Sequence, residues 1–146
     1  MKIFKSRKVK TPIRGTAQSA GLDFYVPDNF LEMVLPPGVG VNIPSGIHVR
    51  IPKNHVLIMF NKSGISLNKK LQVGACVIDE DYQGEVHLHV INVGRSLVKI
   101  EPGQKLVQGI LLPVAYSYVK ETESLEDLYE ATTTRGDGAF GSTGLD

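Results

Sequence analysis

"GACVIDEDYQGEVHLHVINVG", residues 74 to 94, holds two apolar runs with a polar turn between them. Val77 and Ile78 precede the turn at Gly84, and "EVHLHVIN" after it alternates apolar and polar residues. Alternation with a period of two is typical of a strand that buries one face. The stretch is therefore predicted to be a β-hairpin with an acidic tip.

Comparable short runs, separated by Gly, Pro and Asn, occur along most of the chain. They are "KIFKS", "GLDFYVP", "LEMVLPPG", "VGVNIPSG", "GIHVRIPKN", "HVLIMFNKSG", "LVKIEPGQ" and "KLVQGILLPV". Turn signals at this spacing, without long helical patterns between strands, predict an all-β antiparallel sandwich, jelly roll or barrel. Only "GISLNKKL" and "SLEDLYE" are expected to form short helices.

Composition narrows the classes of protein. A chain of 146 residues is about one domain, its single Cys76 cannot form an internal bridge, and no apolar run is long enough to span a bilayer. The first residues carry charges but no apolar core of a secretory signal, so a soluble, intracellular, cytoplasmic protein is expected. With 7% aromatic residues and a net charge of +1, no nucleic-acid or membrane partner is expected.

The tail "RGDGAFGSTG", residues 135 to 144, allows three interpretations. An adhesive Arg-Gly-Asp tripeptide would require an extracellular protein. A dinucleotide-binding G-x-G-x-x-G must follow a strand and open a helix, and too few residues remain here for that helix. A glycine-rich arm that closes over phosphates remains.

Five stretches then occur in a specific order: "SAGLDFYVP" at 19 to 27, "NKSGIS" at 61 to 66, the acidic hairpin, "PGQKLVQGILLPV" at 102 to 114, and the tail. Together they resemble the five motifs of the trimeric dUTPases. The resemblance implies a distorted jelly-roll β-barrel over residues 1–130, a flexible C-terminal arm over 131–146, and a homotrimer. It also implies Mg²⁺-assisted hydrolysis of dUTP to dUMP and pyrophosphate, which limits uracil in DNA and supplies dUMP.

The hairpin carries the chemistry that this resemblance implies. Asp79 matches the acid that orients and deprotonates the attacking water. Tyr82 matches the ring that packs under the deoxyribose and leaves no room for a 2′-hydroxyl. Uracil would be read by the main chain of Cys76, Val77, Ile78 and Asp79 and by His87, because main-chain donors and acceptors can match its edge.

The other motifs imply contacts to phosphate and metal. Ser63 and Gly64, preceded by Lys62, would cradle phosphates, Gln108 would add a contact, and Asp23 would support Mg²⁺ through water. In the arm, Arg135 would bind the γ-phosphate and Phe140 would stack on uracil. Further contacts are expected from the arm residues Gly141, Ser142 and Thr143.

Some positions depart from the family pattern. Lys62 replaces the usual Arg, and Gln104-Lys105 replace an Asp-Arg pair, so the Arg-to-Asp contact between the second and fourth motifs is expected to be missing. His87 and His89 share a strand face, where they could ligate a metal between copies or simply line an interface. Two alternative functions are a dCTP deaminase of the same fold and a trimer that binds a regulatory protein.

Overall fold

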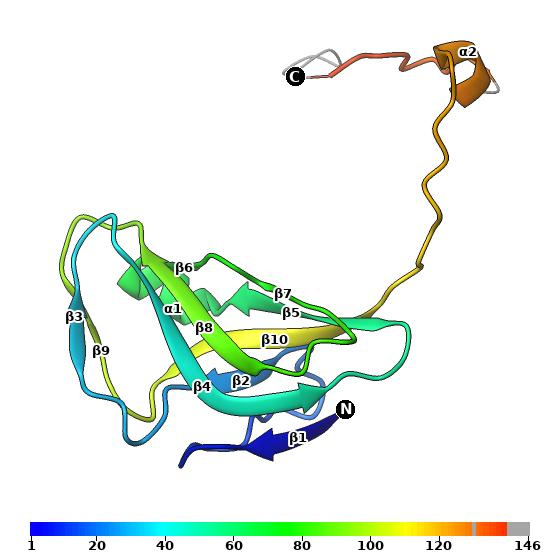
Figure 1. Ribbon diagram of the computed structural model, residues 1–146. Helices are drawn as coiled ribbons and strands as arrows, with labels where there is room; N and C mark the ends of the chain where they lie inside the picture. Colours follow the sequence, from blue (N-terminus) through cyan, green and yellow to red (C-terminus); the bar gives the residue numbers. More distant parts are fainter. Residues whose placement is uncertain (130, 140–146) are drawn as a thin grey trace. The chain divides into compact units, whose positions relative to one another are not determined.

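The structure is a computed structural model that describes residues 1–129 and 131–139. The chain divides into two units, Met1–Ala115 and a second that begins at Tyr116. Figure 1 shows the elements in chain order. They are β1 (Lys2–Lys5), β2 (Leu22–Tyr25), β3 (Met33–Leu35), β4 (Gly40–Arg50), β5 (His55–Asn61), α1 (Ser63–Lys69), β6 (Leu71–Val73), β7 (Val77–Ile78), β8 (Glu85–Asn92), β9 (Val98–Ile100), β10 (Lys105–Pro113) and α2 (Leu125–Leu128).

The strands of the first unit form antiparallel sheets, as the sequence predicted. One sheet has the order β1-β4-β8-β6, a second has the order β2-β10-β5-β7, and β3 and β9 form a two-stranded sheet. The all-β jelly-roll class is thereby confirmed. Hydrogen bonding among the described residues does not close these sheets into one continuous barrel.

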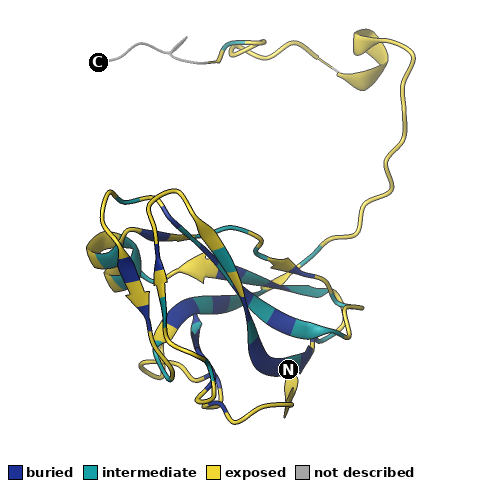
Figure 2. Ribbon diagram, turned by 60° about the vertical axis from the view of Figure 1, so that its left-hand side comes forward, coloured by how far each residue is buried: buried dark blue, intermediate teal, exposed yellow. Residues whose placement is uncertain are grey.

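The hydrophobic core lies under the inward faces of these strands (Figure 2). Strand β8 shows the reason most clearly, because its residues alternate between fully buried and partly exposed along its whole length. Val86, Leu88 and Val90 point into the core, whereas His87 and His89 lie on the other face. The prediction that the two histidines share a strand face is confirmed.

The prediction of two separate strands around "IPSG" is wrong, because β4 runs through this stretch. Its pairing with β8 shifts register between Pro44 and His48, so the chain bulges instead of turning. Strand β1 pairs with β4 only from Ile47 to Arg50, so Pro44 needs no N–H on that side. Gly46 has φ 76, a left-handed conformation that glycine adopts without strain.

Both short helices are confirmed, as α1 and α2. In the second unit, the side chain of Ser124 caps α2 by accepting a hydrogen bond of 3.1 Å from the N–H of Asp127. Residues 116 to 129 belong to this unit, although the sequence placed the boundary after residue 130. This division by packing does not test which residues close over a site, so the closing arm at 131–146 stays a prediction. Within the described ranges, no helix is both long and apolar enough to cross a membrane.

Candidate active site

The prediction of a paired β-hairpin at residues 74 to 94 is wrong, because β7 pairs with β5 in one sheet and β8 pairs with β4 and β6 in the other. The chain only reverses as it crosses between the two sheets, and this reversal at residues 77 to 92 keeps the name hairpin.

The turn at its tip folds the ring of Tyr82 back toward β8. The N–H of Tyr82 donates to the carbonyl of Asp79 over 3.2 Å, and its hydroxyl donates to the carbonyl of Glu85 over 3.0 Å. A Cβ at Gly84 would overlap the phenol ring in this position, so the ring can lie here only because residue 84 is glycine. A larger residue at 84 would displace the ring, which is partly exposed.

A pocket of about 280 Å³ opens beside the hairpin. Six of the sequence-predicted residues line it: Cys76, Val77, Ile78, Asp79, Tyr82 and His87. Sequence reasoning missed Asn42, Met59 and Glu85, which also line it. Glu85 lies directly after the hairpin glycine and could have been suspected, whereas Asn42 and Met59 come from strands that only the fold brings here.

Strand β7 presents main-chain groups at the edge of its sheet. It pairs with β5 through Val77 opposite Ile58 and Ile78 opposite Leu57, and no other strand in the described part of the chain pairs with it. The carbonyl of Cys76 accepts a hydrogen bond of 2.8 Å from the N–H of Met59. The outer edge of β7 therefore offers donors and acceptors to a ligand, as an edge strand does.

The two histidines of β8 have fixed ring orientations. The carbonyl of Glu85 can only accept, so Nδ1 of His87 donates to it over 2.9 Å, and neutral His87 keeps an acceptor at Nε2. The N–H of Ala75 donates to Nδ1 of His89 over 2.7 Å, and a Cβ at Gly74 would overlap that ring. Among residues 1–129 and 131–139, no three His, Cys, Asp or Glu side chains are grouped to bind a metal ion.

A second polar cluster joins the first, second and fourth motifs at the other end of β5. Gln108 of β10 lies opposite Asp23 of β2, and its side chain covers Gly21, where a Cβ would overlap it. Its Nε2 donates to the carbonyl of Asn61 over 2.9 Å. Gln108 thus holds the end of β5 just before Lys62 and Ser63.

Asp23 is the centre of this cluster, with only 5% of its surface exposed. One carboxylate oxygen pairs with Nζ of Lys62, and the other lies 3.0 Å from Nζ of Lys105. Burial raises the pKa of Asp23, but the hydrogen bonds and charges of the two lysines outweigh it, and the pKa falls below its usual value. Asp23 therefore links the second and fourth motifs by charge through Lys62 and Lys105. Among the described residues, no ion pair joins these two motifs directly.

The side chains around Asp23 are better suited to a metal ion that is brought in by a bound nucleotide than to one held permanently by the protein. Both carboxylate oxygens of Asp23 already bind ammonium groups, and no three-ligand group exists among the described residues. Mg²⁺ keeps several waters and accepts few carboxylates when phosphate oxygens are present. Asp23 can meet such an ion through water, as the sequence suggested.

The residues after β5 leave space for a ligand. Ser63 and Gly64 are exposed, and a Cβ at Gly64 would meet no atom within 4 Å. The side chain of Lys62 is held toward Asp23. This arrangement leaves the main chain of the second motif open, as a phosphate cradle requires.

Within one chain, the pocket beside the hairpin and the polar cluster around Asp23 lie near opposite ends of β5. Continuing the β5–β7 register places Asp79 opposite Val56, and the side chain of Glu80 accepts from the N–H of Asn54 over 2.6 Å. Strands rise about 3.3 Å per residue, so about 20 Å of β5 separate Val56 from Lys62. Figure 1 shows the same separation, with α1 and the hairpin at opposite ends of β5.

The described part of the tail forms a turn around Arg135. Its Nε donates to the carbonyl of Gly138 over 3.0 Å, and Gly136 has φ 53. Four of the predicted contact residues lie outside the described residues: Phe140, Gly141, Ser142 and Thr143.

Comparison with known proteins identifies the class. The family model described as dUTPase matches residues 7–144. The chain is 34% identical over 141 residues to the deoxyuridine 5′-triphosphate nucleotidohydrolase of variola virus, covering 97% of this chain and 90% of that protein. It is 32% identical over 139 residues to the human mitochondrial enzyme of that name, covering 95% of this chain but only 52% of the human protein. The chain belongs to the dUTPase family.

Solved structures agree on the fold. The dUTPase of Staphylococcus bacteriophage 80alpha with dUPNHPP superposes with a TM-score of 0.84 at 23% identity, covering 99% of this chain and 98% of that one. The dUTPase of Staphylococcus aureus phage phi11, described with a structural Mg(II) ion, gives 0.73 at 20% identity over 86% of this chain and 97% of that one.

Proposed function

We propose that this protein hydrolyses dUTP to dUMP and pyrophosphate. The observation that carries the proposal is the pocket beside the hairpin, which gathers Asp79, Tyr82, His87 and the edge of β7. Family membership and the names of the relatives support the same substrate. In a cell, this activity would limit uracil incorporation into DNA and supply dUMP.

Asp79 is the residue that acts on the water. Its carboxylate is exposed, and among the described residues it makes no hydrogen bond or ion pair, so it is free to accept a proton. Water held by Asp79 attacks the α-phosphorus and gives its proton to the carboxylate, while the bond from that phosphorus to the bridging oxygen breaks and pyrophosphate leaves. A well-placed base contributes a factor of about 10²–10⁴ to such a step.

Residues that precede and follow Asp79 in the sequence select the base and the sugar of the nucleotide. The outer edge of β7 and the acceptor Nε2 of His87 match the alternating acceptors and donor of uracil, which cytosine does not present. The ring of Tyr82, held over Gly84, lies under the sugar and excludes a ribose hydroxyl.

The phosphates are bound by the second cluster, contributed by another copy of the chain. Lys62, Ser63, Gly64 and Gln108 lie too far along β5 from Asp79 to meet the same α-phosphate in one chain. Copies arranged around a threefold axis bring one chain's hairpin to the next chain's cluster, which supports a homotrimer. Mg²⁺ carried by the triphosphate and met through water by Asp23 would neutralise phosphate charge.

The arm completes the site. Arg135 supplies a forked donor suited to the γ-phosphate. The segment after it would cover the nucleotide through Phe140, Gly141, Ser142 and Thr143.

The test is a substrate panel. The purified protein with Mg²⁺ is incubated with dUTP, dCTP, dTTP and UTP, and pyrophosphate release and the product base are measured. We expect pyrophosphate and dUMP from dUTP alone. Deamination of dCTP, or no reaction with dUTP, would refute the proposal.

A further inference from the structure

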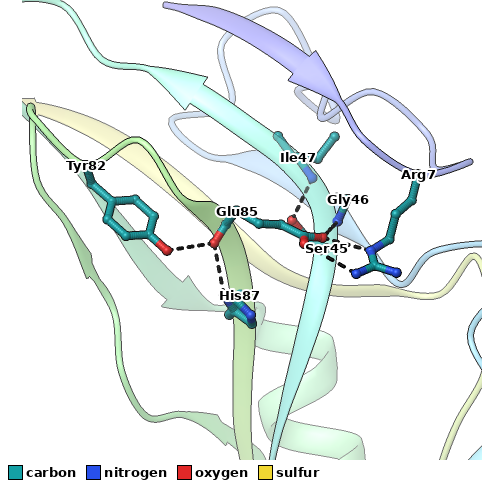
Figure 3. Close-up of polar contacts among 7 residues, drawn as sticks. All are labelled: Arg7, Ser45, Gly46, Ile47, Tyr82, Glu85 and His87. Atoms are coloured by element: carbon teal, nitrogen blue, oxygen red, sulfur yellow. Dashed lines mark hydrogen bonds and ion pairs between the residues drawn. The ribbon is translucent and has the colours of Figure 1, made fainter.

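The main-chain carbonyl of Glu85 is the shared anchor of two pocket residues. It accepts from the hydroxyl of Tyr82 over 3.0 Å and from Nδ1 of His87 over 2.9 Å (Figure 3). The position of this one oxygen therefore sets both the phenol ring and the imidazole. Whatever holds Glu85 in place also holds the two side chains that face the nucleoside.

The side chain of Glu85 is itself held by groups outside the hairpin. Its carboxylate lies 3.0 Å from Nε of Arg7 and 3.5 Å from Nη2, and Oε1 also accepts from the N–H of Gly46. Only 17% of this side chain is exposed. Burial raises the pKa of Glu85, but the hydrogen bonds from Arg7 and Gly46 and the charge of Arg7 outweigh it, and the pKa falls. Glu85 thus stays ionised and bound.

The β4 bulge is shaped to receive this ion pair. Gly46 has φ 76, and a Cβ there would lie 2.8 Å from Cβ of Arg7. The buried hydroxyl of Ser45 accepts from the N–H of Ile47 over 3.1 Å and holds the bulge closed (Figure 3). Three segments far apart in the sequence thus meet at one carboxylate.

We propose that Arg7 and Glu85 are positioning residues that hold Tyr82 and His87 and thereby set the discrimination between dUTP and UTP. The inference rests on the proposed function, because it assigns a cause to the sugar selectivity of that site. Arg7 lines no part of the pocket, so it acts only through Glu85. Tyr82 is 42% exposed and depends on its hydroxyl bond and its contact with Gly84 to stay in place.

The test compares Arg7→Ala, Arg7→Lys and Glu85→Gln with wild type. The matched control is Lys99→Ala, which removes another exposed pair, with Glu32 and Glu101, from β9. The readouts are kcat and KM for dUTP and UTP, the affinity for a non-hydrolysable imido analogue of each, and the melting temperature. An effect on stability alone would change the melting temperature and leave the substrate ratio unchanged.

We expect Arg7→Ala to lower the ratio of kcat/KM for dUTP over UTP by about tenfold or more, chiefly through KM, because a loosened ring no longer rejects the 2′-hydroxyl. Glu85→Gln should act in the same direction, Arg7→Lys should retain part of the ratio, and Lys99→Ala should keep all of it. The imido analogues should show the same order of affinities.

A wild-type ratio in both Arg7→Ala and Glu85→Gln would overturn the positioning role, even if both variants melted at lower temperature. A wild-type protein that binds the dUTP analogue selectively but does not hydrolyse dUTP would refute the proposed function instead, and the analogue affinities would still decide the role of Arg7.

Discussion

Asp79 stands just after a two-residue strand and presents its carboxylate to solvent. Asp79→Asn is expected to keep the fold and nucleotide binding and to lower kcat by at least about a hundredfold, because an amide can hold water but cannot take its proton. Steady-state kinetics with dUTP, together with analogue binding, measures both effects. Turnover at the wild-type rate would remove Asp79 from the mechanism.

Asp23 makes the stability of the protein sensitive to acid. Its folded-state pKa lies below the unfolded value of about 3.9, so its ion pairs contribute fully above that pH and are lost as pH falls through the folded-state pKa. Asp23→Asn should therefore lower the free energy of unfolding by about 1–3 kcal/mol at pH 7. It should also flatten the fall in stability below about pH 4.

Urea unfolding of both proteins between neutral and acid pH measures this. Asp137→Asn, which removes an exposed acid of the second unit, is the control. Equal slopes in wild type and Asp23→Asn would contradict the role of the lysine pairs.

The difference between these two residues shows what sequence can and cannot predict. Asp79 belongs to one contiguous hairpin, so its neighbours in the sequence are also its neighbours in the pocket. Lys62 is 39 positions along the chain from its partner Asp23, and Arg7 is 78 positions from its partner Glu85. Such contacts depend on strand pairing and register, which local patterns do not fix.

At the level of elements, the proposed sugar selectivity depends on the chain reversal between β7 and β8. Gly84→Ala is expected to displace the ring of Tyr82, because the added methyl would occupy its place. The ratio of kcat/KM for dUTP over UTP should fall about tenfold, with a change in unfolding free energy below about 1 kcal/mol, because the ring is partly exposed.

Kinetics with both substrates and a thermal melt measure the two effects. Gly15→Ala is the control, since a Cβ there would meet only Ser19 Oγ at 3.7 Å. An unchanged substrate ratio in Gly84→Ala would show that the ring position does not select the sugar.

Most elements follow from alternation and turn residues, which is why the strands and both short helices were predictable. The exception is β4, where "IPSG" has the composition of a turn but forms a bulge. A turn and a bulge use the same residues, and only the pairing of the flanking segments with β8 and β1 decides between them.

At the level of the whole molecule, separation of the two clusters predicts complementation between inactive chains. In the proposed homotrimer, Asp79→Asn would damage the part of the site contributed by the hairpin, and Gln108→Ala would damage the phosphate-binding part contributed by a different subunit. Mixed trimers from equal amounts of the two variants should recover about a quarter of wild-type activity, since that fraction of shared sites combines two intact parts. Trimers of either variant alone should stay nearly inactive.

The measurement is dUTP hydrolysis after co-refolding, with light scattering to establish the oligomeric state. No recovery in well-mixed trimers, or full wild-type activity in a monomer of 15.9 kDa, would refute sites shared between chains. Sequence alone indicated this assembly only through the family resemblance, because composition and periodicity describe one chain and not its contacts with copies.

Strand β7 has a consequence for how base selection can change during evolution. A ligand read by its main chain is insensitive to which side chains occupy Val77 and Ile78, because every residue except proline offers the same N–H and carbonyl. Single substitutions there would alter packing and leave the order of donors and acceptors intact. Selection for a different base, or for resistance to a uracil analogue, would need a register shift or an insertion, which are rarer events than point mutations.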